Sequence, residues 1–382
     1  MKTIKRPMET GFAPEEYVNI LLKDRKCDKT DLLFYDIETT GLSPLQDMVY
    51  LIGTAAYNGV SWEYTGYFCE EEADEPLILE AFTKLSEKYS IYIQYNGSTF
   101  DKPFISKRCE IHRIPYTAPD NETDLFREFS NLKRLLSLPS MKQITLEKFL
   151  SISRSFPGGK DGIKLWKAFL ADHDPIKEKM LIGHNYEDLS GLVNITVMAA
   201  YLQLYHGMIY VPEPAASKRV ISDFVQITSG SEQINANSGQ INQDTEQISV
   251  DTEYYTSVSE HITITPDRIA LRFCPVIQFP VDFAYKSDQL YLKVCGENAF
   301  AVLPLKDGKM RLYYPDYRNY DYIPSEDTAI TRSLSCFLDK SLRKRARPET
   351  CYTWFDPSDG FLKDAARQEK YLKQVLPIIL RL

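Results

Sequence analysis

The chain has 382 residues, which is too long for one ordinary domain, so we expect two domains that each bury a core of their own. Hydrophobic residues make up 43% of the sequence and charged residues 26%, a balance that excludes a mainly disordered chain. Fifty-three acidic and 45 basic side chains give a formal net charge of −8. That sign excludes nucleic-acid binding through bulk positive charge, although a local basic patch stays possible.

The sequence carries no signal for a membrane or for secretion. No stretch approaches the roughly 18 apolar residues that cross a bilayer, and the segment MKTIKRPMETGF lacks the apolar core of a secretory signal. The seven cysteines are scattered, odd in number and never spaced as CxxC, which is typical of free thiols in a reducing compartment. We therefore expect a cytoplasmic protein without a membrane partner.

Residues 30–211 alternate between strand and helix patterns and follow an N-terminal extension, residues 1–29, with a short amphipathic helix. Apolar runs predict strands at 32–38, 48–57, 61–69 and 90–96, and a helical pattern occupies 75–89. The Asn58-Gly59 pair indicates a hairpin between the second and third strands. Antiparallel strands followed by a helix and a further strand predict a mixed α/β sheet. Neither GxGxxG nor GxxxxGK[ST] occurs, which argues against a Rossmann or P-loop fold.

Residues 212–253 are rich in Ser, Gln, Asn and Asp, and they predict a polar linker or surface insertion. The Gln-Ile pair recurs there every seven residues, but a coiled coil needs two apolar positions per heptad. Residues 254–382 predict a smaller, β-rich α+β domain with a hairpin turn at Asp307-Gly308. A helix is expected from Ser325 through an apolar stripe that reaches Leu342, and the last helix is expected to end before Pro377.

Asp36 and Glu38 lie two residues apart at the end of the first predicted strand. Strand geometry places both side chains on one face, with their Cα atoms about 6–7 Å apart. Two such carboxylates repel by about 4 kcal/mol at 4 Å in an effective dielectric near 20, and a divalent cation between them would remove that cost. Oxygen ligands favour Mg²⁺ or Mn²⁺. Solvated acids at a strand end are the alternative, but the full run D-I-E-T-T-G, with Gly41 allowing a sharp turn, is more selective.

Two further acidic positions are ambiguous when each is taken alone. Asp101 follows an Asn-Gly turn and begins a predicted helix, where a capping role is the simpler interpretation. Asp188 lies in the first turn of a helix with a long apolar stripe. His184 would share its face, about 6 Å away, if the helix extends that far. Otherwise Asn185 caps this helix and His184 belongs to a loop, which is the simpler interpretation for this segment alone.

Together the three segments resemble the DEDD superfamily of proofreading-type exonucleases, and most of all its YprB-like ribonuclease H-like branch, over residues 30–205. The shared motifs are D-x-E-T-T-G, Y-N-G-x-x-F-D, and a Tyr or His four residues before the last Asp. The resemblance implies a ribonuclease H-like mixed sheet flanked by helices. His184 stands at the Tyr spacing of one subgroup, whereas the His subgroup places it five residues before the Asp, so its role stays open.

The resemblance also implies the roles of individual residues. Asp36, Glu38, Asp101 and Asp188 would hold two Mg²⁺ or Mn²⁺ ions, one activating a water and one stabilising the leaving 3′ oxygen. His184 would orient or deprotonate that water, since imidazoles exchange protons near neutral pH. The expected contacts to nucleic acid are Thr39, Gly41, Tyr95, Asn96, Lys102, Arg108 and Lys142. For the basic members of this set, a solvated helix face is an equally good interpretation.

The function implied is that of a metal-dependent nuclease, a 3′–5′ exonuclease acting on single-stranded DNA or RNA with a free 3′ end. The alternative is a catalytically silent nuclease fold that binds nucleic acid or serves as a scaffold. The sequence does not decide whether the substrate is DNA or RNA, or whether cleavage is exonucleolytic or endonucleolytic. The second domain would present substrate or bind a protein partner, and the sequence names neither.

Overall fold

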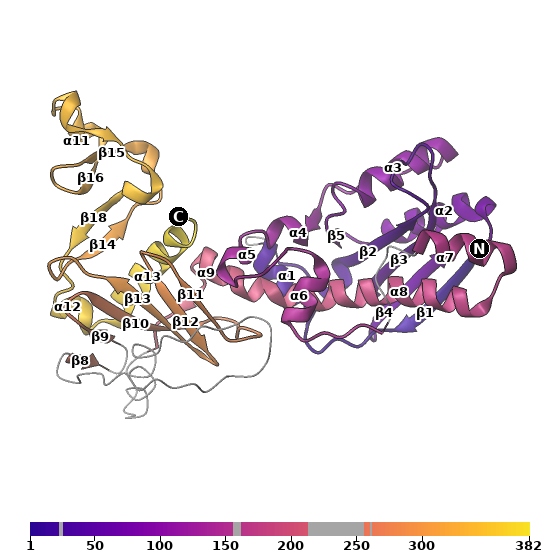
Figure 1. The fold of residues 1–382 in the computed structure, drawn as a ribbon, viewed down its shortest axis with the longest axis horizontal. Coiled ribbons are helices and arrows are strands. Elements are labelled where there is room, and N and C mark those ends of the chain that lie inside the picture. Colours follow the sequence, from indigo (N-terminus) through magenta and orange to yellow (C-terminus); the bar gives the residue numbers. More distant parts are fainter. Residues whose placement is uncertain (23–25, 156–161, 213–255, 260–261) are drawn as a thin grey trace. The chain divides into compact units, whose positions relative to one another are not determined.

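The computed structural model describes the whole chain except residues 23–25, 156–161, 213–255 and 260–261. The described residues form two compact units, one of residues 1–133 and 139–199 and one of residues 134–138 and 200–382 (Figure 1). None of the helices in these described ranges combines the length and the apolar character that crossing a bilayer needs. The predicted polar linker at 212–253 lies almost entirely outside the described residues.

The first unit is built on a mixed sheet with the strand order β1-β4-β3-β2-β5-β6. Its strands are β1 (Lys2–Pro7), β2 (Leu32–Thr39), β3 (Val49–Tyr57), β4 (Trp62–Phe68), β5 (Ile91–Gln94) and β6 (Glu122–Asp124). The pairs from β1 to β2 are antiparallel, whereas β5 and β6 run parallel to β2. This arrangement confirms the mixed α/β sheet. The edge strand β1 was not predicted, because its charged and largely exposed residues form no apolar pattern.

Helices cover both faces of this sheet. They are α1 (Pro14–Leu22), α2 (Glu75–Ser86), α3 (Asp101–His112), α4 (Leu125–Glu128), α6 (Gln143–Phe149), α7 (Gly162–Asp172) and α8 (Pro175–Asn194), with α5 (Leu132–Leu135) where the units divide. The long helix α8 packs on β2, β3 and β4 (Figure 1). Tyr35 of β2 points the other way and contacts Phe82 of α2, their ring centroids 5.6 Å apart. Because side chains alternate along a strand, Asp36 and Glu38 share the α8 face.

Helix α8 begins ten residues before Asn185. Pro175 occupies its first position, and the carboxylate of Asp174 caps it by accepting a hydrogen bond from the N–H of Ile176 at 2.8 Å. Asn185 is therefore in the middle of the helix, and the interpretation of Asn185 as a cap is wrong. His184 and Asp188 consequently lie one helical turn apart on the same face.

The second unit is rich in antiparallel strands. Its strands are β7 (Ile209–Tyr210), β8 (Thr256–Ser259), β9 (Ile262–Ile264), β10 (Arg268–Pro275), β11 (Phe283–Lys286), β12 (Tyr291–Cys295), β13 (Asn298–Pro304), β14 (Met310–Tyr313), β15 (Tyr320–Ile323), β16 (Thr328–Thr331), β17 (Lys344–Arg345) and β18 (Tyr352–Phe355). Strands β7 to β13 form one sheet, β14 pairs with β18, and β15 lies between β16 and β17. Its helices are α9 (Gln203–His206), α11 (Arg332–Ser335), α12 (Asp359–Leu362) and α13 (Ala365–Ile379), and the 3₁₀ segment Ile195–Leu202 crosses the unit boundary.

Three details of this unit differ from the expectation. The helix predicted from Ser325 is wrong, because β16 occupies its start and α11 is a single turn. Its apolar stripe is not a core stripe, since Phe337 is 86% exposed. The Asp307-Gly308 turn is present, with both residues at positive φ, but β14 pairs with β18 instead of β13. Helix α13 also continues through Pro377 to Ile379, whose side chain is buried.

Candidate metal and nucleic-acid site

Strand β2 delivers the first two acids to the α8 face of the sheet. Residues 32–35 are fully buried, so the strand is fixed in register before it reaches Asp36. Asp36 lies opposite Gly53 of β3. A Cβ at Gly53 would come within 1.9 Å of Oδ1 of Asn185, so only glycine lets α8 approach the sheet this closely.

Asn185 ties α8 to the strand that carries Asp36. Its Nδ2 donates to Oδ2 of Asp36 at 3.0 Å, and its Oδ1 accepts from the hydroxyl of Tyr64 at 3.0 Å. The side chain is completely buried, so both hydrogen bonds replace solvent. Sequence reasoning missed this role because it placed Asn185 at a helix end.

Asp101, from helix α3, contacts the same strand β2. It is the first residue of α3, only 7% exposed, and its Oδ1 accepts a hydrogen bond from the backbone N–H of Ile37 at 3.1 Å. The turn before it requires Asn96 at φ 61°, and the backbone N–H of Asn96 donates to Oδ1 of Asp124 at 2.8 Å. The carboxylate therefore binds the strand between Asp36 and Glu38.

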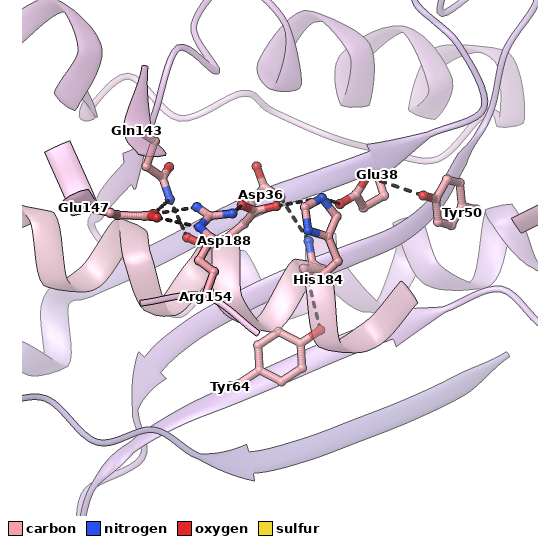
Figure 2. A network of polar contacts seen from close by, with 10 residues as sticks. Asp36, Glu38, Tyr50, Tyr64, Gln143, Glu147, Arg154, His184 and Asp188 are labelled. Carbon is pink, nitrogen blue, oxygen red and sulfur yellow. Dashed lines mark hydrogen bonds and ion pairs between the residues drawn. The ribbon is translucent and has the colours of Figure 1, made fainter. Parts of the chain in front are cut away.

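The third segment adds an imidazole and a carboxylate from α8. Nε2 of His184 lies 3.3 Å from Oδ2 of Asp188 and 3.7 Å from Oε1 of Glu38 (Figure 2). One ligand atom from each of these three residues lies within 4.8 Å of the others. The hydroxyl of Tyr50 donates to Oε2 of Glu38 at 3.4 Å. Nδ1 of His184 is buried and has no hydrogen-bond partner among the residues that the structure describes.

Burial and mutual repulsion make these acids hard to ionise. Burial, then the charges of Asp101, Asp188 and Glu38, raise the pKa of Asp36 well above its ordinary value, and the charge of Arg154 opposes them. Burial and the charge of Asp188 likewise raise the pKa of Glu38 to about 8. Burial also raises the pKa of Asp101 to about 7, against the hydrogen bond from Ile37. The cluster concentrates negative charge that a cation would relieve.

Sequence reasoning missed a cation in this network, the side chain of Arg154. Its Nε and Nη2 donate to the two oxygens of Glu147, each at 2.5 Å, and its Nη1 donates to Oδ1 of Asp188 (Figure 2). Glu147 also accepts from Nε2 of Gln143 at 2.9 Å. A single arginine in an irregular segment has no periodic pattern. The sequence gives only a weak sign of a buried ion pair here, namely an acid, Glu147, directly after the buried Leu146 of α6.

The uncharged residues predicted to contact nucleic acid differ in their exposure and in their contacts. Thr39 donates from Oγ1 to the carbonyl of Gly41 at 2.7 Å, and a Cβ at Gly41 would meet the Asp47 carboxylate at 2.3 Å. The hydroxyl of Tyr95 donates to the carbonyl of Met141, which holds the ring between two chain segments. Asn96 is exposed beside it. Thr39 and Gly41 lie at and just after the end of β2, which carries Asp36 and Glu38, and Tyr95 and Asn96 lie between β5 and α3, which begins with Asp101.

The basic residues predicted to meet nucleic acid divide into two kinds. Nζ of Lys102 donates to the carbonyl of Pro119 at 2.9 Å and lies 3.2 Å from Glu122. Arg108 forms a two-point pair with the buried carboxylate of Glu75. Both contacts favour a structural role, because the charged groups already have acidic partners. Lys142, by contrast, is exposed at the start of α6.

The donor set fits a hard divalent cation. Carboxylate oxygens dominate it and suit Mg²⁺ or Mn²⁺, whereas the single imidazole alone would suit Zn²⁺. A bound cation would favour loss of the proton from Glu38, whose pKa is raised to about 8. Asp36, Glu38, Asp101 and Asp188 are the residues that could hold one or two such ions, and His184 lies beside them. Among the described residues, the group with ligand atoms within 4.8 Å of one another consists of Glu38, His184 and Asp188. Asp36 and Asp101 are outside this group, although the charges of Asp101, Asp188 and Glu38 all raise the pKa of Asp36.

Comparison with known proteins gives three findings. Residues 33–200 match the family model of the RNase_H superfamily. The chain is 30% identical over 156 residues to the catalytic subunit of DNA polymerase epsilon from Dictyostelium discoideum, an alignment that covers 39% of this chain and 6% of that protein. The family B DNA polymerase of the archaeon Pyrobaculum calidifontis aligns with 47% of this chain and 25% of its own, at 15% identity and a TM-score of 0.38. The chain therefore spans only a small part of these polymerases.

The family match includes β2, α3 and α8, the elements that carry the four acids and His184. It supports the superfamily and leaves the subfamily undecided. Residues 33–200 form a domain of the ribonuclease H superfamily.

Proposed function

We propose that the ribonuclease H-like domain is a metal-dependent nuclease of the DEDD type, close to the YprB-like branch, that removes nucleotides from the 3′ end of single-stranded DNA or RNA. The observation that supports the proposal is the group of Glu38, His184 and Asp188, beside which Asp36 feels the charges of Asp101, Asp188 and Glu38. Asp36, Glu38 and Asp101 all have raised pKa values. Such a cluster is costly for a fold and useful for binding cations. We assign the activity to residues 30–211.

Asp36, Glu38, Asp101 and Asp188 would hold two Mg²⁺ or Mn²⁺ ions. Such ions lower the pKa of bound water and neutralise charge on a phosphate that is being hydrolysed. His184, within 3.3 Å of Asp188 and 3.7 Å of Glu38, would accept the proton of the attacking water. Asn185 holds Asp36, and the backbone of Ile37 holds Asp101, so these side chains need no rearrangement.

The nucleic acid would enter past the turns that border the acids. Thr39 ends β2, whereas Gly41, Tyr95 and Asn96 lie on these turns, and Lys142 offers an exposed ammonium next to Met141, which Tyr95 contacts. Lys102 and Arg108 are left out of this surface because each pairs with an acid of the domain. The second unit would present the strand or bind a protein partner.

A degradation panel tests the proposal. Single-stranded DNA, single-stranded RNA and duplexes, each with a free or a blocked 3′ end, are incubated with Mn²⁺ and the products are resolved by size. We expect stepwise shortening of single strands with a free 3′ end, lost in excess chelator and in the Asp36→Asn variant. Internal cuts in blocked strands would replace the exonuclease assignment by an endonuclease. Binding without any cleavage would favour the scaffold alternative, in which Arg154 neutralises Asp188 permanently.

A further inference from the structure

Glu147 and Arg154 form a largely buried, doubly hydrogen-bonded ion pair beside the candidate site. Glu147 is 1% exposed and accepts from two nitrogens of the guanidinium. Gly191 of α8 faces it without a side chain, and a Cβ there would lie 2.0 Å from Oε1 of Glu147. The fold therefore reserves space next to α8 for a buried carboxylate, and that carboxylate holds Arg154 in one orientation.

The segment that carries Arg154 is anchored to α8 at consecutive residues. The backbone N–H of Ser155 donates to Oε1 of Glu187 at 2.7 Å, next to the contact between Arg154 and Asp188. Nε2 of Gln143 joins the same elements, since it donates to the carbonyl of Asp188 at 2.8 Å as well as to Glu147. Rotation of the guanidinium away from α8 would break its bonds to Glu147 and to Asp188 together.

The two oxygens of Asp188 have different partners. Oδ1 accepts from Nη1 of Arg154, whereas Oδ2 lies 3.3 Å from Nε2 of His184, on the side of Glu38. A carboxylate on a helix can otherwise turn about its terminal torsion, which is broad. Arg154 therefore fixes the orientation of the Asp188 carboxylate, so that one oxygen stays bound to the guanidinium and the other faces Glu38 and His184.

We propose that Arg154, locked by Glu147, is a positioning residue that orients Asp188 for metal binding. This inference rests on the proposed function, because it takes Asp188 to be a metal ligand. The guanidinium also carries a positive charge, which by itself opposes a cation nearby. Positioning and charge repulsion therefore predict opposite changes in metal affinity, and substitutions can separate them.

The experiment is a Mn²⁺ titration of the full chain by calorimetry. Arg154→Lys keeps the charge and loses the two-point geometry, Arg154→Met loses both, and Glu147→Gln leaves Arg154 in place but weakens its anchor. We expect each of these variants to bind Mn²⁺ about tenfold more weakly, as is usual when a group that orients a metal ligand is removed. The matched control is Arg108→Lys, which breaks the same kind of two-point pair, with Glu75, a residue outside the group of Glu38, His184 and Asp188. It should leave Mn²⁺ affinity unchanged.

Other outcomes overturn the inference. Tighter Mn²⁺ binding by Arg154→Met with unchanged binding by Arg154→Lys would make the guanidinium a competing cation. Unchanged affinity in all three variants, with lowered thermal stability, would make the pair purely structural. Cleavage of a labelled single strand is measured separately. If wild type binds Mn²⁺ and the variants bind it more weakly but nothing is cleaved, the proposed function fails and the positioning role stands.

Discussion

The backbone N–H of Ile37 donates to Oδ1 of Asp101 at 3.1 Å, although 64 residues separate them in the chain. Ile37 is the residue between Asp36 and Glu38, so this single bond joins the second acidic segment to the first. The carboxylate of Asp101 is buried beside other acids, which raises its pKa, and the hydrogen bond from Ile37 opposes that rise. Asp101 thus has a structural role besides the proposed metal binding, and substitutions can separate these two roles.

Asp101→Asn should abolish cleavage while preserving the fold, because the amide oxygen can still accept from Ile37 but carries no charge. Asp101→Ala should also cost about 1–3 kcal/mol of unfolding free energy, since it leaves a buried N–H unpaired. Urea unfolding and a cleavage assay on both variants measure the two effects. Full cleavage by Asp101→Asn would remove Asp101 from the set of ligands.

The stability of the metal-free protein should fall as pH rises. The folded state holds protons on Glu38 up to about pH 8 and on Asp101 up to about pH 7, whereas ordinary values are 4.5 and 3.8. Between these limits the folded state binds more protons than the unfolded state, so the unfolding free energy decreases with pH. Urea unfolding in chelator at pH 5.5, 7 and 8.5 checks this.

The same linkage predicts how metal acts. Because ligands must lose their protons, the stabilisation by Mg²⁺ should grow over the same pH range. Glu38→Gln is the control, since it cannot titrate and should flatten the decline in chelator. A wild-type protein whose stability rises from pH 5.5 to 8.5 without metal would contradict the assigned pKa shifts.

Gly53→Ala should damage the site through α8. The added methyl would overlap Oδ1 of Asn185 and the Cδ1 atom of Leu189, at 1.9 and 2.6 Å, so the helix must shift away from β3. We expect a loss of about 1–3 kcal/mol of stability and a large loss of cleavage, because Asn185 then releases Asp36. Gly11→Ala is the matched control, since a Cβ there meets no atom of the described residues within 4 Å. Equal behaviour of the two variants would contradict the packing described.

His184→Ala should slow cleavage by about 10²–10⁴-fold with little change in the affinity for a labelled single strand. The proposed role is proton acceptance, so the substitution acts on the rate constant kcat more than on KM. Single-turnover cleavage and fluorescence anisotropy measure the two quantities. A variant that cleaves at the wild-type rate would show that the imidazole is not the base.

Local patterns in the sequence predicted the framework of this site. The apolar run before Asp36 and the period of two place Asp36 and Glu38 on one face, and the Asn-Gly turn signals separate the strands. The start of α8 was misplaced because Gly183 and Asn185 interrupt its apolar pattern, although both are buried. Asn185 fits there because it packs on Gly53 of β3 and bonds to Tyr64 and Asp36, which a single segment of sequence does not reveal.

The partners of several charged and apolar side chains depend on tertiary contacts, which the sequence alone does not reveal. Arg154 and Glu147 are distant from the acidic motifs and meet Asp188 only after α6 and α8 pack together. Lys102 and Arg108 have the spacing of a basic helix face, yet Glu122 and Glu75 bind them within the fold. In the second unit, an apolar stripe mimicked a buried helix, whereas Phe337 and Leu334 are exposed there.

The anomalous difference map of a manganese-soaked crystal shows whether these carboxylates bind a divalent cation. We expect Mn²⁺ peaks bounded by the carboxylates of Asp36, Glu38, Asp101 and Asp188, with Oδ1 of Asp188 still bound to Arg154. Well-ordered carboxylates without any manganese peak among them, in a protein that binds Mn²⁺ elsewhere or not at all, would contradict the proposed metal site.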